Sequence, residues 1–252
     1  FLTIVANIYS QSPRPVILFN DNWKFHKGDI PTGEKEIFDD KDWRNVTLPH
    51  DWSIEGPFSN EWASGTGFLP GGIAWYRKTF SLDDLQAGER TFIYFDGVYK
   101  NSEVWLNGQL LGKRPNGYIP FYYELTPHLG KGHNVLAVKV DHSKFADSRW
   151  YPGSGIYRNA YLVIKKPVHI PIWGVTFTTP VITAEKASSE VIVSINNSST
   201  AAANVSIESK LTRNGKPVSS AKKSISLAAN SEQSAKLNMP VLKPQLWSPE
   251  YP

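Results

Sequence analysis

Two segments of the chain combine aromatic rings with charged side chains, a mixture suited to holding a polar ligand with a flat apolar face. The first is SRWYPGSGIYR at residues 148–158, where Trp150 and Tyr151 follow Arg149. The two rings could stack on such a ligand or pack the loop against another part of the protein, because aromatic side chains bury large areas in either role. The glycines of this segment predict a tight bend.

The second segment, HDWSIEGPF at residues 50–58, offers an imidazole beside a carboxylate. Asp51 could accept hydrogen bonds from ligand hydroxyl groups, and His50 could donate one at the rim of a pocket. In the alternative, Asp51 caps the local turn while Trp52 and Phe58 fill the core. The segment therefore predicts either a ligand contact or a structural turn.

Patterns for catalysis or metal binding are weak in the rest of the chain. No two carboxylates stand in a recognisable acid–base setting, the six histidines have no metal-ligand spacing, and cysteine is absent. The glycine-rich stretch 65–72 precedes a strand rather than a helix, which argues against a phosphate-binding loop. We therefore expect no catalytic residue, no cofactor and no metal ion in this chain.

The composition is that of a folded globular protein. Of the 252 residues, 40% are hydrophobic and 20% are charged, which argues against disorder. The net charge of +4 comes from scattered lysines and arginines, so nucleic-acid binding gains no support. No stretch reaches the roughly 18 apolar residues that a membrane span requires. The aromatic share of 13% is typical of β-sandwich cores and of stacking platforms.

The elements that must position both segments are strands. Runs rich in β-branched and aromatic residues, bounded by Gly, Pro, Asn or Asp, predict strands at 74–82, 90–97, 102–108 and 134–142. In the last run, alternation places Leu136, Val138 and Val140 together on the better core face. The pair Asn107–Gly108 predicts a type I′ hairpin turn. Strands at this spacing predict an all-β fold, a jelly roll or sandwich.

The amino-acid composition of the chain changes near residue 167. After it, Val, Ile, Ser, Ala, Asn and Lys form short alternating runs, typical of an immunoglobulin-like sandwich without its cysteine pair. We predict a signal-peptide remnant or opening strand at 1–15, a jelly-roll domain at 16–166 and an immunoglobulin-like β-sandwich at 167–252. The proline-rich stretch 246–252 leads into no closing strand, so we expect a truncated sandwich cut from something longer.

Five segments together resemble family 2 glycoside hydrolases, particularly the β-galactosidase type of gut bacteria, in order and approximate spacing. They are LPHDWSIEGPF (48–58), PGGIAWYRKTF (70–80), YFDGVYKNSEVWLNGQLLG (94–112), NGYIPFYYELTPHL (116–129) and SRWYPGSGIYRNAYLV (148–163). The resemblance implies a galactose-binding-like, sugar-binding first domain, an immunoglobulin-like second domain and a (β/α)₈ barrel beyond this chain. That barrel would supply the acid/base and nucleophile glutamates of retaining hydrolysis, about 5 Å apart. We expect this chain alone not to hydrolyse glycosides.

The resemblance also indicates substrate-binding residues. In related β-galactosidases and β-glucuronidases, a loop presents an Asp to the sugar at the position that Arg149 occupies here, while Asp147 lies two residues earlier. Either Asp147 contacts the sugar through a longer loop, or the Arg149 guanidinium donates in its place. Alternatively, Arg149 pairs with a carboxylate and braces the loop. Asn60 lies where related β-galactosidases offer a sugar-binding Asn. Trp150 and Asp51 complete the predicted set.

The sequence thus predicts the pocket-lining front part of a family 2 enzyme that hydrolyses β-galactosides in carbohydrate metabolism. The alternatives are a β-glucuronidase or β-mannosidase of the same family, a stand-alone carbohydrate-binding module, and a sandwich that only positions a neighbour. The expected partners are a β-galactoside and the barrel of the same polypeptide, with a homo-oligomer left open. We expect a periplasmic or secreted protein if residues 1–15 are a signal remnant, and a cytoplasmic one otherwise.

Overall fold

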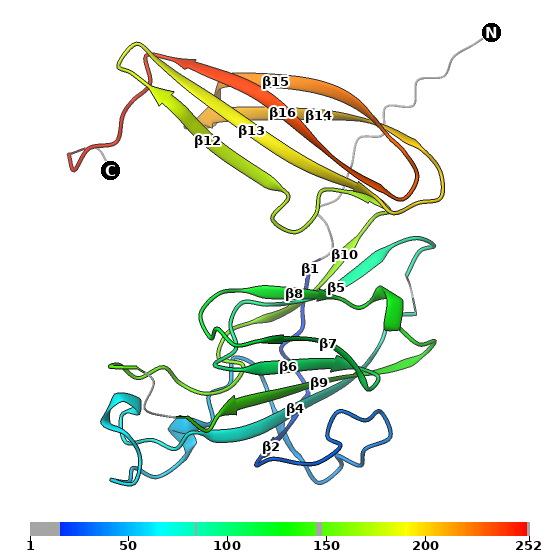
Figure 1. Ribbon diagram of the computed structural model, residues 1–252, viewed down its shortest axis with the longest axis vertical. Coiled ribbons are helices and arrows are strands. Elements are labelled where there is room, and N and C mark those ends of the chain that lie inside the picture. The colour runs from blue at the N-terminus through cyan, green and yellow to red at the C-terminus, as the bar shows by residue number, and fades with distance from the viewer. Residues whose placement is uncertain (1–15, 84, 145–147, 251–252) are drawn as a thin grey trace. The chain divides into compact units, whose positions relative to one another are not determined.

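The computed structural model describes residues 16–83, 85–144 and 148–250. The predicted leader at 1–15 and the candidate ligand Asp147 lie outside the described residues. Between Ile164 and Lys165 the chain divides into two compact units (Figure 1). The regular elements of the described residues are strands and three short 3₁₀ helices, which confirms the predicted all-β class.

Unit 1 is a sandwich of two sheets. The larger sheet contains, in spatial order, β3 (Arg44–Val46), β2 (Trp23–Lys27), β4 (Gly72–Ser81), β9 (His133–His142), β6 (Ser102–Leu106) and β7 (Gln109–Arg114). Every neighbouring pair in it is antiparallel. The smaller sheet contains β1 (Val16–Leu18), β10 (Ala160–Lys165), β5 (Arg90–Phe95) and β8 (Phe121–Glu124). The 3₁₀ helices η1 (Ser53–Glu55), η2 (Ser64–Thr66) and η3 (Thr126–His128) lie in the connections.

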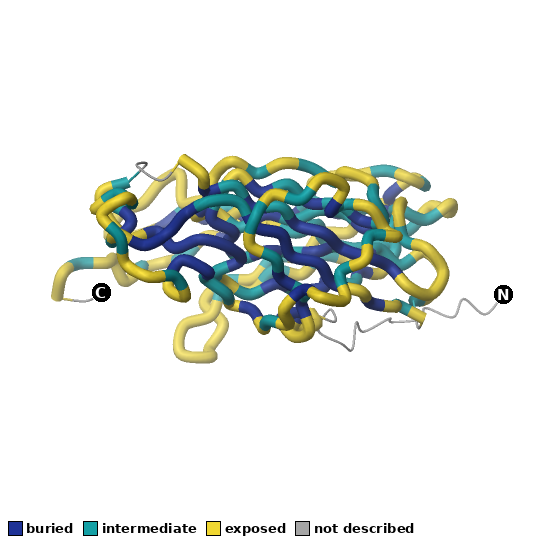
Figure 2. Tube along the Cα trace, turned by 90° about the horizontal axis from the view of Figure 1, so that it is seen from below, coloured by how far each residue is buried: buried dark blue, intermediate teal, exposed yellow. Residues whose placement is uncertain are grey.

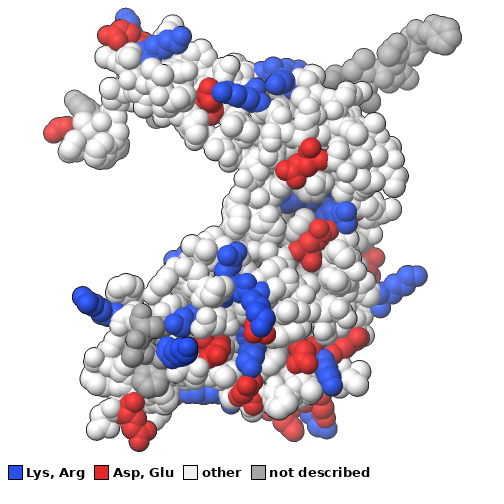
Figure 3. Space-filling model, viewed as in Figure 1, with Lys and Arg blue, Asp and Glu red and all other residues white. Residues whose placement is uncertain are grey.

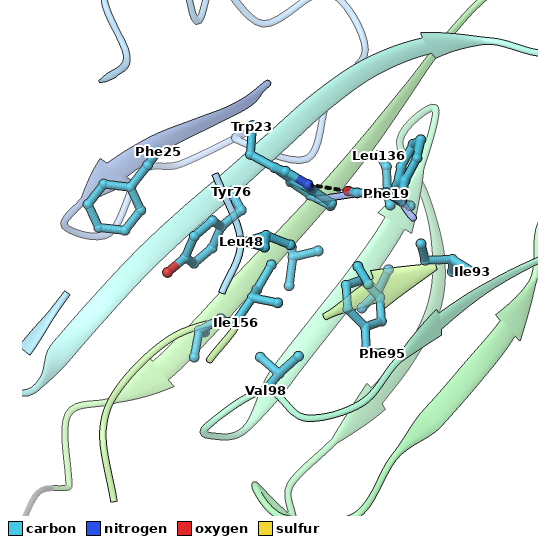
Figure 4. Packing of buried hydrophobic residues seen from close by; sticks show 14 of the residues in the cluster. Phe19, Trp23, Phe25, Leu48, Tyr76, Ile93, Phe95, Val98, Leu136 and Ile156 are labelled. Carbon is cyan, nitrogen blue, oxygen red and sulfur yellow. Dashed lines mark hydrogen bonds between the residues drawn. The ribbon is translucent and has the colours of Figure 1, made fainter. Parts of the chain in front are cut away.

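The core of unit 1 lies between these two sheets (Figure 4). Leu136, Val138 and Val140 of β9 are completely buried in it, as the alternation predicts. Ala137, on the opposite face of β9, is buried as well, because Trp75 and Trp105 stack over that face with ring centroids 5.3 Å apart. The larger sheet is therefore covered on both faces, which simple alternation does not predict.

The hairpin predicted at Asn107–Gly108 is present. Leu106 pairs with Gln109, and the two turn residues have φ values of 51° and 80°, the left-handed pair that a type I′ turn needs. The Asn107 side chain also bonds to the backbone of Val135 and to the Asn134 side chain, which joins this turn to the start of β9.

Unit 2 is a smaller antiparallel sandwich, in agreement with the predicted immunoglobulin-like class. The long β13 (Lys186–Asn197) pairs with β11 (Val168–His169), β12 (Val175–Ile182) and β16 (Ser231–Leu242). A second layer consists of the hairpin β14 (Ala203–Arg213) and β15 (Lys216–Leu227). Inward side chains of both layers form one apolar cluster. Figure 2, which shows the chain from below, has buried positions along many of the strands and exposed positions mainly in the loops.

Candidate functional site

Two neighbouring segments of unit 1 meet a third that is distant in sequence. They are the turn 50–56, which contains η1, the loop 64–67, which contains η2, and the segment 148–156. The first and third run side by side, since His50 N donates to Ile156 O at 2.8 Å and Trp52 N donates to Ser154 O at 3.1 Å. The second lies against the third, because a side chain at Gly65 would collide with the Ser148 carbonyl. The structure thus brings both predicted ligand segments together.

Asp51 lies at the junction of these segments. Its Oδ1 accepts hydrogen bonds from Ser53 N at 3.0 Å and from Ser154 N at 2.8 Å. Its Oδ2 accepts one from the Tyr151 hydroxyl at 2.5 Å. Burial, together with this hydrogen bond to Asp51, raises the pKa of Tyr151, so the hydroxyl keeps its proton at neutral pH. The bond to Ser53 N is the turn cap that the sequence offered as an alternative.

The predicted bend in 148–158 is present and depends on glycine. Gly153 has a φ of +75°, and a Cβ atom there would lie 2.9 Å from Asp51 Oδ2. Gly155 has a φ of +116°, and a Cβ atom there would collide with the Tyr76 hydroxyl. Both positions combine a left-handed backbone with a close approach, the two situations that favour glycine.

A buried polar cluster stabilises the bend at 153–155. The Ser154 hydroxyl lies 2.6 Å from Ser53 Oγ and 2.7 Å from His142 Nδ1. Ser53 Oγ also lies 2.7 Å from the Pro70 carbonyl. All three side chains are buried, so the hydrogen bonds replace those that water would otherwise make. This cluster joins the bend to β9 and to the turn 50–56.

His50 does not serve as a free donor at a rim. Its Nδ1 lies 2.8 Å from the Tyr76 hydroxyl, and its Nε2 lies 3.1 Å from Glu55 Oε1. Glu55 in turn pairs with Arg44 at 2.5 Å. Burial lowers the pKa of His50, which favours the neutral ring. Both ring nitrogens therefore have partners within the protein.

Trp150 and Arg149 face solvent. The Trp150 side chain is 60% exposed, and its indole Nε1 donates to the Tyr118 hydroxyl at 2.9 Å. Arg149 is exposed, and among the described residues its guanidinium has neither a hydrogen-bond partner nor an ion-pair partner. The bracing ion pair that the sequence offered as an alternative for Arg149 is therefore not present within that part of the chain.

The segment 57–70 carries the other predicted contact, Asn60, which is exposed. Its ends are joined where Ser59 N donates to Phe68 O at 2.9 Å. Phe58 is 76% exposed, so its prediction as a core residue is wrong, because the chain has already left the sheets at that point. Trp52, predicted for the core in the same alternative, is buried.

Sequence reasoning missed Tyr118, Ser53 and Ser154 as members of this site. The Trp150–Tyr118 bond spans 32 positions and the Ser53–Ser154 bond spans 101, so no local spacing could reveal either pair. The one available signal was the run of glycine and serine at 153–155, which predicts close backbone approach.

The charges around the site do not form a patch of one sign. Acidic and basic side chains alternate over the face of unit 1 that is visible in Figure 3. The described residues contain no group of three or more His, Asp or Glu side chains that could hold a metal ion. None of the helices in the described ranges is long and apolar enough to cross a membrane. The described side chains of the site can bind a ligand through hydrogen bonds and aromatic stacking.

Comparison with known proteins identifies the two units. Residues 19–167 match the sugar binding domain of glycosyl hydrolases family 2, and residues 168–252 match a second model of that family. The chain is 45% identical to a β-galactosidase of Bacteroides ovatus over 96% of its length. It is 39% identical to a putative β-glucuronidase of Formosa agariphila over 93% of its length. It spans only 29% and 22% of these two relatives.

Solved structures agree with this assignment. A family 2 member from Bacteroides cellulosilyticus has a TM-score of 0.81 at 36% identity, over 95% of this chain and 32% of that one. A β-glucuronidase from Bacteroides uniformis has a TM-score of 0.83 at 27% identity, over 95% of this chain and 29% of that one. The chain therefore belongs to glycosyl hydrolase family 2 and consists of a sugar-binding domain followed by an immunoglobulin-like domain.

Proposed function

We propose that this chain lines the sugar pocket of a β-galactoside hydrolase and supports a catalytic barrel of the same polypeptide. The observation that carries the proposal is the segment 148–152, which presents Arg149 and the Trp150 ring to solvent while both of its aromatic residues are tied to the domain. The 45% identity to a β-galactosidase supports galactose as the sugar.

The exposed groups suit the two surfaces of a pyranose. The Trp150 ring offers a face for the apolar C–H side of the sugar. The Arg149 guanidinium offers several fixed donors for hydroxyl oxygens, and the Asn60 amide offers both a donor and an acceptor. Such contacts orient the sugar for attack without taking part in bond cleavage. Cleavage itself would use two carboxyl groups of the barrel.

A second candidate is a β-glucuronidase of the same family. The exposed Arg149 guanidinium favours it, because a guanidinium binds a carboxylate through two parallel hydrogen bonds. The relationship to a putative β-glucuronidase supports the same reading. In this case Arg149 would contact the carboxylate of a uronic acid rather than the hydroxyls of galactose.

Calorimetry of the chain with galactose, lactose and glucuronate, followed by kinetics of the full-length enzyme, tests both candidates. We expect hydrolysis of β-galactosides by the full-length enzyme and a loss of about tenfold in kcat/KM for Arg149→Ala, equivalent to one charged hydrogen bond. Arg158→Ala, an exposed arginine of the same segment, is the matched control. Unchanged kinetics in Arg149→Ala would show that this residue does not contact the sugar. Binding by the chain alone would favour a stand-alone carbohydrate-binding module.

A further inference from the structure

We propose that Asp51 is a positioning residue, which fixes the sugar-contacting segment 148–152 through Tyr151 and does not itself bind the sugar. This refines the sequence prediction, in which Asp51 accepts hydrogen bonds from sugar hydroxyls. The importance of the segment for sugar binding rests on the proposed function, whereas the mechanical role of Asp51 rests on geometry alone.

The first argument is that most of the acceptor capacity of Asp51 is already used. An ionised carboxylate has about four acceptor sites. Three are taken by Ser53 N, Ser154 N and the Tyr151 hydroxyl, at 3.0, 2.8 and 2.5 Å. The backbone of Gly153 closes in beside Oδ2, where even an added Cβ atom would come within 2.9 Å of that oxygen. A sugar hydroxyl would have to displace one of these partners or use the single remaining site on Oδ2, beside Gly153.

The second argument is that Tyr151 and Trp150 are anchored to different parts of unit 1. The Tyr151 hydroxyl donates to Asp51 in the turn 50–56, and the Trp150 indole donates to Tyr118 in the turn that precedes β8. Tyr118 is itself packed against the Tyr99 ring, with centroids 5.3 Å apart. Two consecutive side chains with separate anchors leave the backbone of this segment little freedom.

The anchors also determine what the segment can offer a ligand. The Tyr151 O–H and the Trp150 N–H are both committed to the protein. What remains for a ligand is the exposed ring face of Trp150 and the donors of Arg149. This combination suits a pyranoside with one apolar face and acceptor oxygens on its edge. Because the segment is held before the ligand arrives, binding costs less conformational entropy.

The removal of either end of the Asp51–Tyr151 bond should therefore have the same consequence. Tyr151→Phe keeps the ring and removes only the hydroxyl. Asp51→Asn keeps the shape, and its remaining oxygen can still accept from the Ser53 and Ser154 amides. In both variants the charge-assisted bond is lost, and such a bond contributes more to stability than a neutral one.

Amide hydrogen exchange of the chain tests this without any ligand. We expect the backbone amides of Ser154 and Gly155, which are hydrogen-bonded at the end of this segment, to exchange about tenfold faster in Tyr151→Phe, the fold-change of one charge-assisted hydrogen bond. Asp51→Asn should have at least as large an effect, because it also makes the bonds to Ser53 and Ser154 neutral, and the double variant should exchange no faster than Asp51→Asn alone. Tyr161→Phe, a partly exposed tyrosine of β10, is the control and should leave these amides unchanged. Effects that add, or an unchanged rate in Tyr151→Phe, would overturn the proposal.

The same variants separate positioning from direct contact when galactose affinity or, in the full-length enzyme, KM is measured. If Asp51 acts through Tyr151, Tyr151→Phe weakens binding, and adding this change to Asp51→Asn weakens it no further. Unchanged binding in Tyr151→Phe together with a loss in Asp51→Asn would reveal a direct sugar contact and overturn the proposal. If exchange is altered in the variants but the full-length enzyme does not bind galactose, the proposed function is refuted. The positioning role of Asp51 is still supported in that case.

Discussion

The two units are both antiparallel sandwiches, yet they use side chains in different ways. In unit 1, hydrogen bonds between side chains join segments about 100 residues apart, such as Tyr151–Asp51 and Ser53–Ser154. In unit 2, the described side-chain bonds connect neighbouring strands or nearby turns, such as Ser194–Ser234 across β13 and β16. Most strands of unit 2 are long, and exposed apolar side chains lie on β12, such as Phe177, and after β16, such as Trp247.

This difference indicates which unit holds its irregular segments at defined positions. Long-range polar bonds hold irregular segments at defined positions, and a binding site needs that because its contacts come from loops. A sandwich with mainly local polar bonds needs only its apolar cluster to remain folded. We infer that unit 1 carries the ligand chemistry and that unit 2 serves chiefly as a scaffold.

The largest expected effect comes from the core of unit 1. Trp23 is fully buried, and its indole nitrogen donates to the Phe19 carbonyl at 2.8 Å. Trp23→Ala should reduce the free energy of unfolding by about 3–5 kcal/mol, because it creates a large cavity. Trp247→Ala in unit 2, where the side chain is 74% exposed, should change it by less than about 0.5 kcal/mol. Urea titrations followed by circular dichroism measure both, and a comparable loss in the two variants would contradict the contrast.

The next effect concerns the bend against Asp51. Gly153→Ala should destabilise the chain by about 1–3 kcal/mol, because it combines a left-handed backbone with a clash at Asp51. Gly215→Ala in unit 2 is a matched control, since its φ of +76° is similar and nothing lies within 4 Å of the added carbon. The difference between the two melting temperatures isolates the cost of the clash. Equal shifts would show that the bend tolerates movement.

A third comparison uses serines. Ser154→Ala removes a buried hydroxyl that bonds with both Ser53 and His142, and it should cost about 1–3 kcal/mol of unfolding free energy. Ser194→Ala, which removes an exposed serine bond in unit 2, should cost less than about 0.5 kcal/mol. Thermal denaturation of both variants checks this, and a neutral Ser154→Ala would mean that the polar cluster does not hold the bend.

The smallest effect is a dependence on pH in unit 1. Burial lowers the pKa of His50, so the unfolded chain binds a proton more readily than the folded one. Its contribution to stability is complete above about pH 6.5, the ordinary value for histidine, and is lost as the pH falls below that value. The stability lost between pH 7 and pH 5 should therefore be smaller in His50→Gln than in the unaltered chain. Identical losses in the two proteins would exclude His50 as the source.

The sequence alone predicted much of this protein. Period-two alternation identified the core face of Leu136, Val138 and Val140, and the pair Asn107–Gly108 identified a hairpin turn, because both features depend on neighbouring residues. Five segments in the order and approximate spacing of family 2 glycoside hydrolases indicated the family, which the comparisons confirm. Alternation failed at Ala137, where stacked tryptophans cover the outer face, and the core assignment of Phe58 was wrong.

The tertiary structure decided the partners of the site residues. Sequence types indicated that Asp51, Arg149 and Trp150 could bind a ligand, since their donors, acceptors and rings are properties of single side chains. Only the fold shows that Asp51 accepts from Tyr151, 100 positions away, and that Trp150 donates to Tyr118. The physical reason is that a hydrogen bond needs two groups within about 3 Å, and chain spacing does not encode that distance once strands from different sheets lie between them.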